Sequence, residues 1–179
     1  MQEDRAAFLR AVAAGIQDHL RRYIETDGGD GAYYRDMSAQ GGDPKAKTLV
    51  LQTFGRRTGR EQLAPLLYNT WGDDLIIVAS KGGADQHPAW YLNILEAKEV
   101  VVQVRDKRYR CTWHVAEGAE RETLWRFMSA YYPAYAEYQT HTNRLIPVVV
   151  LTPVGEVAER FVWRPGEGVD AAMKEAGAG

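Results

Sequence analysis

The sequence predicts an α+β fold built on a small antiparallel β-barrel, closed or half-open. Six apolar or alternating runs have the length of β-strands, and tight turns join several of them. Only a few short helical patterns interrupt these runs, as expected for a small barrel, and the strand–helix alternation of a Rossmann fold is absent. A chain of 179 residues with this pattern is expected to form a single domain spanning 1–179.

The expected strands follow one another within a core segment, residues 47–155. Gly72-Asp73-Asp74 and Asp106-Lys107 supply hairpin turns. The fifth strand alternates cleanly between apolar and polar residues, and Cys111, the only cysteine, lies on its apolar face. We therefore expect Cys111 to be a small buried hydrophobe. The strands are expected at 47–54, 63–71, 75–80, 99–105, 108–116 and 146–153.

Segments of other kinds flank and interrupt the strands. An amphipathic helix is expected over 1–25, because apolar residues recur there at steps of three and four. Its favoured use is packing on the barrel, and weak contact with a membrane surface is the alternative. The Gly-rich segment 26–46 is long for a loop, which suggests mobility or a lid. Short helices are expected at 88–97 and 119–131, and a flexible tail at 162–179.

Composition narrows the classes of partner. The formal net charge of −2 argues against a dedicated nucleic-acid binder, whose domain is normally basic. No apolar run is long enough to span a membrane, and the first residues do not resemble a signal peptide. We therefore expect a cytoplasmic protein, peripheral to a membrane only if the N-terminal helix touches one.

A basic turn is expected between the first two strands. Arg56, Arg57 and Arg60 crowd it, and their charges repel one another unless an anion is present. Gly55 and Gly59 permit positive φ angles, which let backbone N–H groups converge. Arginine adds a planar fork that fits phosphate or carboxylate oxygens. Alone, the turn fits an anion cradle and a solvated basic hairpin tip equally well. The candidate residues are Thr53, Gly55, Arg56, Arg57, Thr58, Gly59 and Arg60.

A second glycine turn, Ser80-Lys81-Gly82-Gly83, closes the third strand. Two such turns at adjacent strand ends would surround one phosphate; the alternative is a turn that needs glycine only for its backbone angles. The helix that follows carries Trp90 and Asn93 on one face. Trp90 can stack against a planar ligand, and Asn93 can form hydrogen bonds with the edge of the ligand's ring. For Trp90, however, packing on the barrel as an anchor of the helix is the favoured interpretation.

Three tyrosines recur every third residue near the C-terminal third of the chain: Tyr132, Tyr135 and Tyr138. In a short helix they form an aromatic wall with polar tips, suited to a flat substrate or cofactor that accepts hydrogen bonds. Core packing is the alternative, but buried phenol groups need partners.

Several kinds of chemistry have no support in the sequence. The histidines are scattered, and no spacing of His, Cys, Asp and Glu matches a metal site. There is no Gly-x-Ser-x-Gly elbow, and the basic turn lacks the Gly-Lys-[Ser/Thr] ending of a P-loop. Difficult chemistry would therefore come from a bound organic cofactor.

These motifs together resemble the deazaflavin-dependent nitroreductase and quinone reductase family, within the flavin-binding split β-barrel superfamily. The resemblance covers about residues 48–152, and several motifs in one order are far more specific than one. The matching elements are Thr53–Gly59, Pro65, Ser80–Gly83, Pro88-x-Trp90-x-x-Asn93, and Tyr132-Pro133-x-Tyr135-x-x-Tyr138 through Arg144 and Ile146-Pro147-Val148.

The resemblance implies a six-stranded Greek-key split barrel that binds reduced coenzyme F420. Its phosphodiester and oligoglutamate tail would meet Arg56, Arg57, Arg60 and Lys81, and its ring would lie near Ser80 and the Trp90 helix. The remaining cofactor contacts implied are Thr53, Gly55, Thr58, Gly59, Pro65, Gly82, Gly83, Tyr91 and Asn93.

The resemblance also implies the reaction: hydride transfer to a quinone, an activated enone or a nitroaromatic. Ser80, Tyr132, Tyr135 and Tyr138 would be the catalytic residues that hold the acceptor and donate hydrogen bonds to it. The alternatives are an F420 carrier without catalysis and an FMN-dependent oxidoreductase of the same barrel class. The protein would be a monomer or a homodimer, with no nucleic-acid partner.

Overall fold

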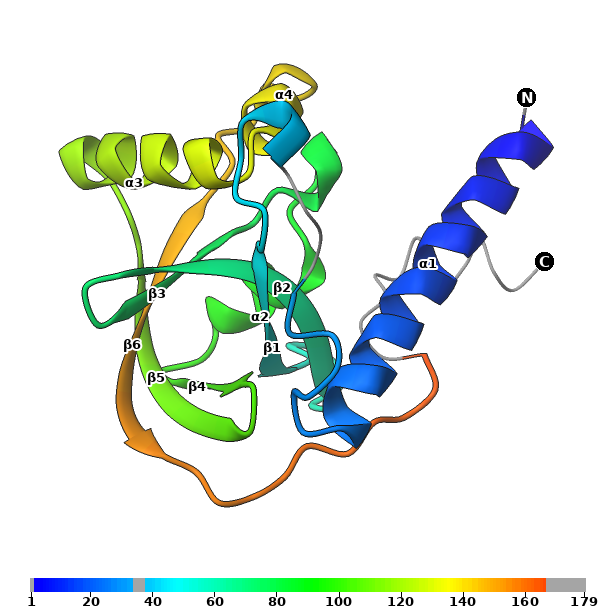
Figure 1. The fold of residues 1–179 in the computed structure, drawn as a ribbon, viewed down its shortest axis with the longest axis vertical. Helices are drawn as coiled ribbons and strands as arrows, with labels where there is room; N and C mark the ends of the chain where they lie inside the picture. The colour runs from blue at the N-terminus through cyan, green and yellow to red at the C-terminus, as the bar shows by residue number, and fades with distance from the viewer. Residues whose placement is uncertain (1, 34–37, 167–179) are drawn as a thin grey trace.

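The computed structural model describes residues 2–33 and 38–166, and its centre is a β-barrel (Figure 1). Antiparallel strands close the barrel in the order β1-β2-β3-β6-β5-β4, which confirms the predicted α+β barrel. Each expected strand is present, with ends shifted by up to three residues. The strands are β1 (Lys47–Phe54), β2 (Glu61–Trp71), β3 (Asp74–Val78), β4 (Val100–Val104), β5 (Lys107–Val115) and β6 (Val148–Glu156).

Strand β2 has only one strand neighbour along part of its length. It pairs with β1 from Glu61 to Tyr68, but with β3 only from Tyr68 to Trp71. Within the described residues, no strand pairs with the second edge of β2 before Tyr68. Pro65 lies on this stretch, opposite Val50 of β1. Because proline has no N–H to donate, it fits a strand with a free edge.

A short helix, α2 (Ala89–Ile94), packs against the barrel interior. Trp90, Tyr91 and Ile94 belong to the same buried cluster as Leu49 and Leu51 of β1. Trp90 is 8% exposed, which agrees with its favoured interpretation as an anchor of this helix. Cys111 also lies in this cluster and is fully buried, as predicted.

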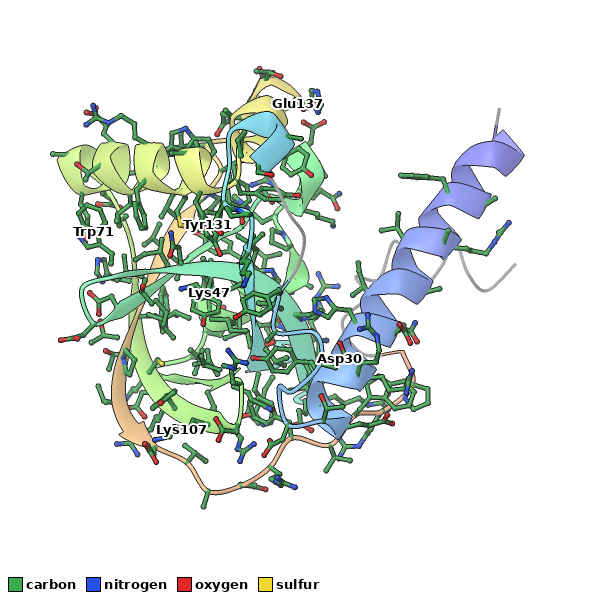
Figure 2. The ribbon with its side chains drawn as sticks, in the orientation of Figure 1. Asp30, Lys47, Trp71, Lys107, Tyr131 and Glu137 are labelled. Carbon is green, nitrogen blue, oxygen red and sulfur yellow. The ribbon has the colours of Figure 1, made fainter. Side chains whose placement is uncertain are left out.

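Two further helices cover one side of the barrel: α3 (Gly118–Tyr131) and α4 (Ala134–Thr140) (Figure 1). Figure 2 shows Tyr131 and Trp71 between α3 and the strands. The Tyr131 hydroxyl accepts a hydrogen bond from the backbone N–H of Lys47, and the Trp71 ring meets Phe127 edge-on, with centroids 4.9 Å apart. These contacts fix α3 to the barrel.

The N-terminal helix, α1 (Gln2–Glu25), leans on the barrel by its C-terminal end, while its N-terminal half points away (Figure 1). Leu20 and Tyr23 are fully buried against the barrel and Phe161, whereas Phe8 is 66% exposed. No helix in the described part of the chain is both long enough and apolar enough to cross a membrane.

The connecting segments bring distant parts of the chain together. In the predicted Gly-rich loop, Tyr33 bridges to Lys47 and a short 3₁₀-helix, η1 (Ser38–Gln40), follows; residues 34–37 lie outside the described residues. The first residues of the predicted flexible tail contact the domain, since Arg164 pairs with Glu61 and the Gly166 N–H donates to Gln17. The rest of that tail, 167–179, lies outside the described residues.

The C-terminal end of α1 meets a polar cluster. Asp27, at positive φ, accepts hydrogen bonds from Arg108 and Arg160, and Gln103 donates to it. The alternation of the fifth strand places Arg108 on the face opposite Cys111, which is expected to be polar, but the Arg108 side chain is only 9% exposed. A carboxylate 81 residues away in sequence makes this burial possible.

Candidate functional site

The basic turn between β1 and β2 is closed by its own backbone. The Gly55 N–H donates to the Arg60 carbonyl at 2.8 Å, and the Gly59 N–H donates to the Gly55 carbonyl at 2.7 Å. Gly59 has the expected positive φ of 66°, and the space beside its Cα is open. Gly55 does not have a positive φ, which corrects the prediction. A Cβ there would lie 2.7 Å from Thr58 Oγ1, so a larger residue would displace that hydroxyl.

The arginines of this turn face solvent without carboxylate partners. Arg56, Arg57 and Arg60 are exposed, and none of them forms an ion pair with the described residues. The nearby Glu61 is instead paired with Arg164 at 2.6 Å. Three arginines around this turn, without carboxylate partners in the described part of the chain, form a surface that an anion with several charges would stabilise.

Asn93 of α2 holds the turn from inside. Its Oδ1 accepts hydrogen bonds from Arg56, from the backbone N at 3.2 Å and from Nη1 at 3.5 Å. Its Nδ2 donates to Thr53 Oγ1 at 3.2 Å and to Gln62 Oε1 at 3.0 Å. These four bonds use the full capacity of the amide, and Asn93 is 3% exposed. Asn93 therefore positions the turn, whereas the sequence suggested that it bonds a ligand ring.

The second glycine turn is a 3₁₀-helix, η2 (Lys81–Gly83), pressed against α4. Gly82 has φ 62° and open space beside it. Gly83 has φ 81°, and a Cβ there would lie 2.5 Å from the Tyr138 carbonyl oxygen. Ser80 is half-buried, and its Oγ forms no hydrogen bond with the described residues. The turn thus presents an unused hydroxyl next to the tyrosine helix.

Arg144 clamps the segment that contains this turn. Its guanidinium donates to the carbonyls of Ala79 at 3.1 Å, Ser80 at 2.7 Å and Ala84 at 2.7 Å, and to His87 Nδ1 at 3.1 Å. Burial lowers the pKa of Arg144, but arginine stays protonated in proteins. One side chain from the loop after α4 therefore fixes the backbone on both sides of Ser80.

The three tyrosines differ in exposure. Tyr132 and Tyr135 are 5% and 4% exposed, and their ring centroids lie 4.9 Å apart in the cluster beneath α3 and α4. Tyr138 is only partly buried, 6.5 Å from Tyr135. The expected wall of three exposed phenol groups is thus reduced to one, because the first two rings fill the core between α4 and the barrel.

The two glycine turns follow strands that run in the same direction, since β1 and β3 are both antiparallel to β2. The end of β1 at Phe54 lies opposite Glu61 of β2. Ile77 of β3 lies opposite Tyr68, so the chain that continues from β3 into Ser80 runs towards the level of Glu61. Both turns therefore follow strand ends on the same side of the barrel, and that they surround one phosphate stays a prediction.

The remaining predicted residues divide between the turn, the strand edge and the core. Thr53 is 4% exposed and accepts from Asn93, and Pro65 lies on the free edge of β2. Trp90 packs into the barrel interior, while Tyr91 faces His87, with ring centroids 4.9 Å apart. The structure therefore brings Thr53–Arg60 to Asn93, and Ser80–Gly83 to Tyr138, as two separate groups.

Sequence reasoning misses the roles of two residues in the second group. The sequence marks Arg144 only as part of a motif, and it carries no signal for Gln139. Gln139 donates to the Arg144 carbonyl at 2.7 Å and accepts from the Ile146 N–H at 2.9 Å, so it fixes the loop that carries Arg144. Most of their partners are backbone atoms, which leave no pattern of side chains in the sequence.

Comparison with known proteins gives a consistent result. The model of the F420H(2)-dependent quinone reductase family matches residues 29–153. An F420H(2)-dependent quinone reductase of Mycobacterium tuberculosis (strain ATCC 25618 / H37Rv) is 36% identical over 108 residues, which cover 59% of this chain and 72% of the relative.

Two solved structures share both sequence and fold with this chain. An F420-H2 dependent reductase (FDR-A) is 40% identical with a TM-score of 0.54, covering 58% of this chain and 92% of its own. A protein described as a domain-swapped dimer is 34% identical with a TM-score of 0.56, covering 75% of this chain and 95% of its own.

Proposed function

Because this chain belongs to the F420H(2)-dependent quinone reductase family, we propose that it transfers a hydride from reduced coenzyme F420 to a quinone. It is therefore an oxidoreductase, and coenzyme F420 is its cofactor. The same relationships favour a reductase over a carrier without catalysis and over an FMN-dependent enzyme.

The exposed arginines of the basic turn, which have no carboxylate partners among the described residues, are the observation that carries this proposal. F420 has a flat deazaflavin ring at one end and a phosphodiester and oligoglutamate tail at the other. Arg56, Arg57 and Arg60, which have no carboxylate partners in the part of the chain that the structure describes, fit the charged tail of F420. The open space beside Gly59 lets that tail approach the arginines closely. The Ser80 turn, with its unused hydroxyl next to the helix that carries Tyr138, fits the ring end.

Bound F420H2 supplies the hydride, from C5 of its ring. The protein's own task is to orient the acceptor and to stabilise the negative charge that develops on the acceptor oxygen. Ser80 Oγ, with no partner among the described residues, and the partly buried Tyr138 hydroxyl are the donors we assign to that oxygen. Solvent can provide the proton that completes the hydroquinone.

Three finer features extend the proposal. Activated enones and nitroaromatics also gain negative charge on oxygen during reduction, so the same donors suit them. Phe8 on α1 is 66% exposed, which allows weak contact with a membrane surface, in a protein we expect in the cytoplasm. A similar solved protein is a domain-swapped dimer, and α1 is the element whose position would permit exchange here. Light scattering on the purified protein distinguishes monomer from dimer.

The cofactor assignment is tested by replacing Arg56 and Arg57 together with alanine. Charge-assisted hydrogen bonds contribute about 1.5–3 kcal/mol each, and exposure favours the lower end, so affinity for F420 should fall at least about tenfold. The loss should grow with the length of the glutamate tail. A control with Arg110 and Arg126 both replaced by alanine removes the same charge elsewhere. Equal affinities for all three proteins would contradict the assignment.

The reaction is tested by mixing the enzyme with F420H2 and menadione and following F420 absorbance. Oxidation of F420H2 that depends on both enzyme and menadione supports the reductase. Tight binding of F420 without any such oxidation would favour a carrier, and tighter binding of FMN than of F420 would favour the flavin enzyme.

A further inference from the structure

A cavity of about 280 Å³ lies where β5 leads into α3, and His87, which Arg144 bonds, is one of its lining residues. Its walls are largely apolar: Val115, Ala116, Leu145 and Pro147. None of the residues of the basic turn or of the Ser80 turn lines it. Tyr91 and His87 form an aromatic side, and Glu117 and Arg121 bring charge.

His87 presents a defined hydrogen-bond donor at this cavity. Arg144 Nη1 lies 3.1 Å from His87 Nδ1, and a guanidinium can only donate, so Nδ1 must accept. The neutral ring therefore carries its proton on Nε2. Burial first, and the charge of Arg144 second, lower the pKa of His87, which keeps the ring neutral near pH 7. The Arg144 contact at Nδ1 therefore fixes the Nε2–H of His87 as the hydrogen-bond donor.

Arg121 is a cation without an anionic partner. Its Nη2 donates to the Ile146 carbonyl at 2.8 Å and its guanidinium lies 5.0 Å from the centroid of Trp125. Among the described residues no carboxylate pairs with it, and its Nε is buried with no hydrogen bond. Burial lowers its pKa. A partly desolvated charge at a cavity wall is normally neutralised by a counter-ion.

We propose that this cavity binds a small aromatic carboxylate, with its ring among the apolar walls and its carboxylate between Arg121 and His87. The apolar lining and the Tyr91 ring suit a flat ring, and an unpaired guanidinium beside an N–H donor suits two carboxylate oxygens. The exposed Glu117 is the one carboxylate among the described residues that line the cavity, and it opposes an anion there. Binding is a property of this cavity alone and does not depend on the proposed reaction.

The test is calorimetric titration of the protein with 2-naphthoate and with its neutral counterpart 2-naphthamide. We expect naphthoate to bind one site, at least tenfold more tightly than naphthamide. Arg121→Gln should weaken naphthoate at least tenfold, while Arg126→Gln on the same helix should leave it unchanged, because Arg126 is exposed and does not line the cavity. Glu117→Gln should tighten binding severalfold.

A second variant keeps the test valid if Arg121→Gln fails to fold. Leu145 is 63% exposed, so Leu145→Trp should be tolerated and should narrow the cavity and abolish naphthoate binding. Saturation with F420 should leave naphthoate affinity unchanged, because Tyr91 is the only one of the residues implied to contact the cofactor that lines the described cavity. Equal binding of acid and amide, binding that survives both substitutions, or competition with F420 would each overturn the proposal.

Discussion

Asn93 belongs to the predicted binding motif, yet its hydrogen bonds in this structure are all made within the protein. Its amide makes four hydrogen bonds within the protein and none of its polar atoms is left for a ligand ring. Thr53, its main partner on β1, is also buried. The side chain therefore joins α2 to the basic turn, so the arginines are held relative to the barrel.

Replacing Asn93 with alanine should lower both stability and cofactor affinity. The change leaves Thr53 Oγ1 and the Arg56 N–H without partners, which should cost about 2–3 kcal/mol of unfolding free energy. Affinity for F420 should fall as the turn loosens, while kcat at saturating cofactor stays close to wild type. Urea unfolding and F420 titration measure both effects, with the exposed Leu95→Ala as control. An unchanged unfolding free energy with lost F420 affinity would instead indicate direct contact.

The hydroxyl of Tyr138 should matter more to turnover than that of Tyr135. Tyr138 is partly buried beside the Ser80 turn, whereas Tyr135 is 4% exposed within the core. Tyr138→Phe removes a donor to the acceptor oxygen and should lower kcat/KM for menadione about tenfold or more. F420 affinity should be unchanged. Steady-state kinetics give kcat/KM for menadione in Tyr138→Phe and in Tyr135→Phe. A larger loss of kcat/KM in Tyr135→Phe would place the acceptor on the other side of α4.

At the scale of elements, η2 and α4 form a clasp around Ser80. Gly83 lies against the Tyr138 carbonyl, and Thr142 donates to Asp85 at 2.9 Å. Arg144 then bonds the backbone on both sides of the turn. These three contacts come from one short segment after α3, so the hydroxyls assigned to the acceptor move as one unit.

The two adjacent glycines of η2 offer a matched comparison. Both have positive φ, so alanine at either position should cost about 1–2 kcal/mol in backbone strain. Gly82→Ala adds a methyl group in open space, whereas Gly83→Ala meets the Tyr138 carbonyl at 2.5 Å. We expect Gly83→Ala to lose about 2 kcal/mol more than Gly82→Ala, as for an overpacked site. Equal melting curves for the two variants would show that α4 does not rest on Gly83.

At the scale of the whole molecule, the Asp27 cluster joins three distant segments. Arg108 of β5 donates to Asp27 at 2.7 Å, and Arg160 from the C-terminal segment binds the other oxygen. Tyr23 donates to the Gln103 carbonyl and accepts from the backbone of Arg105, and burial raises its pKa to about 12. The end of α1 is therefore held by polar contacts around a fully buried ring.

This cluster predicts a pH dependence of stability. Burial alone would raise the pKa of Asp27, but the hydrogen bonds from Arg108 and Arg160 outweigh it and lower the pKa below 3.8. Its stabilisation is therefore complete above about pH 4–5 and is lost as the pH falls through the folded-state pKa.

The substitution Asp27→Asn tests this dependence. Asparagine tolerates a positive φ but cannot form the ionic contacts, so the unfolding free energy at pH 7 should fall by about 2 kcal/mol. The difference from wild type should narrow below about pH 4. Urea unfolding at pH 7 and at about pH 3 measures it, with the exposed Asp18→Asn as control. A difference independent of pH would mean that the charge of Asp27 contributes nothing.

The barrel could be predicted from the sequence, because strands and hairpin turns are local patterns of alternating residues and glycine. The cofactor class could be predicted through the resemblance to a known family, whose motifs Thr53–Arg60, Ser80–Gly83 and the tyrosine motif lie on short contiguous segments. From the residues alone, the basic turn fits an anion cradle and a solvated hairpin tip equally well.

The arrangement of those segments, in contrast, depends on tertiary packing and could not be read from any of them. Packing buries Tyr132 and Tyr135 while leaving Tyr138 partly exposed. The partners that hold Asn93, Arg144 and Asp27 lie from 31 to 133 residues away. These long-range contacts form only when the folded chain brings distant segments together. Many of the acceptors are backbone carbonyls, which every residue carries, so no local pattern of side chains identifies them.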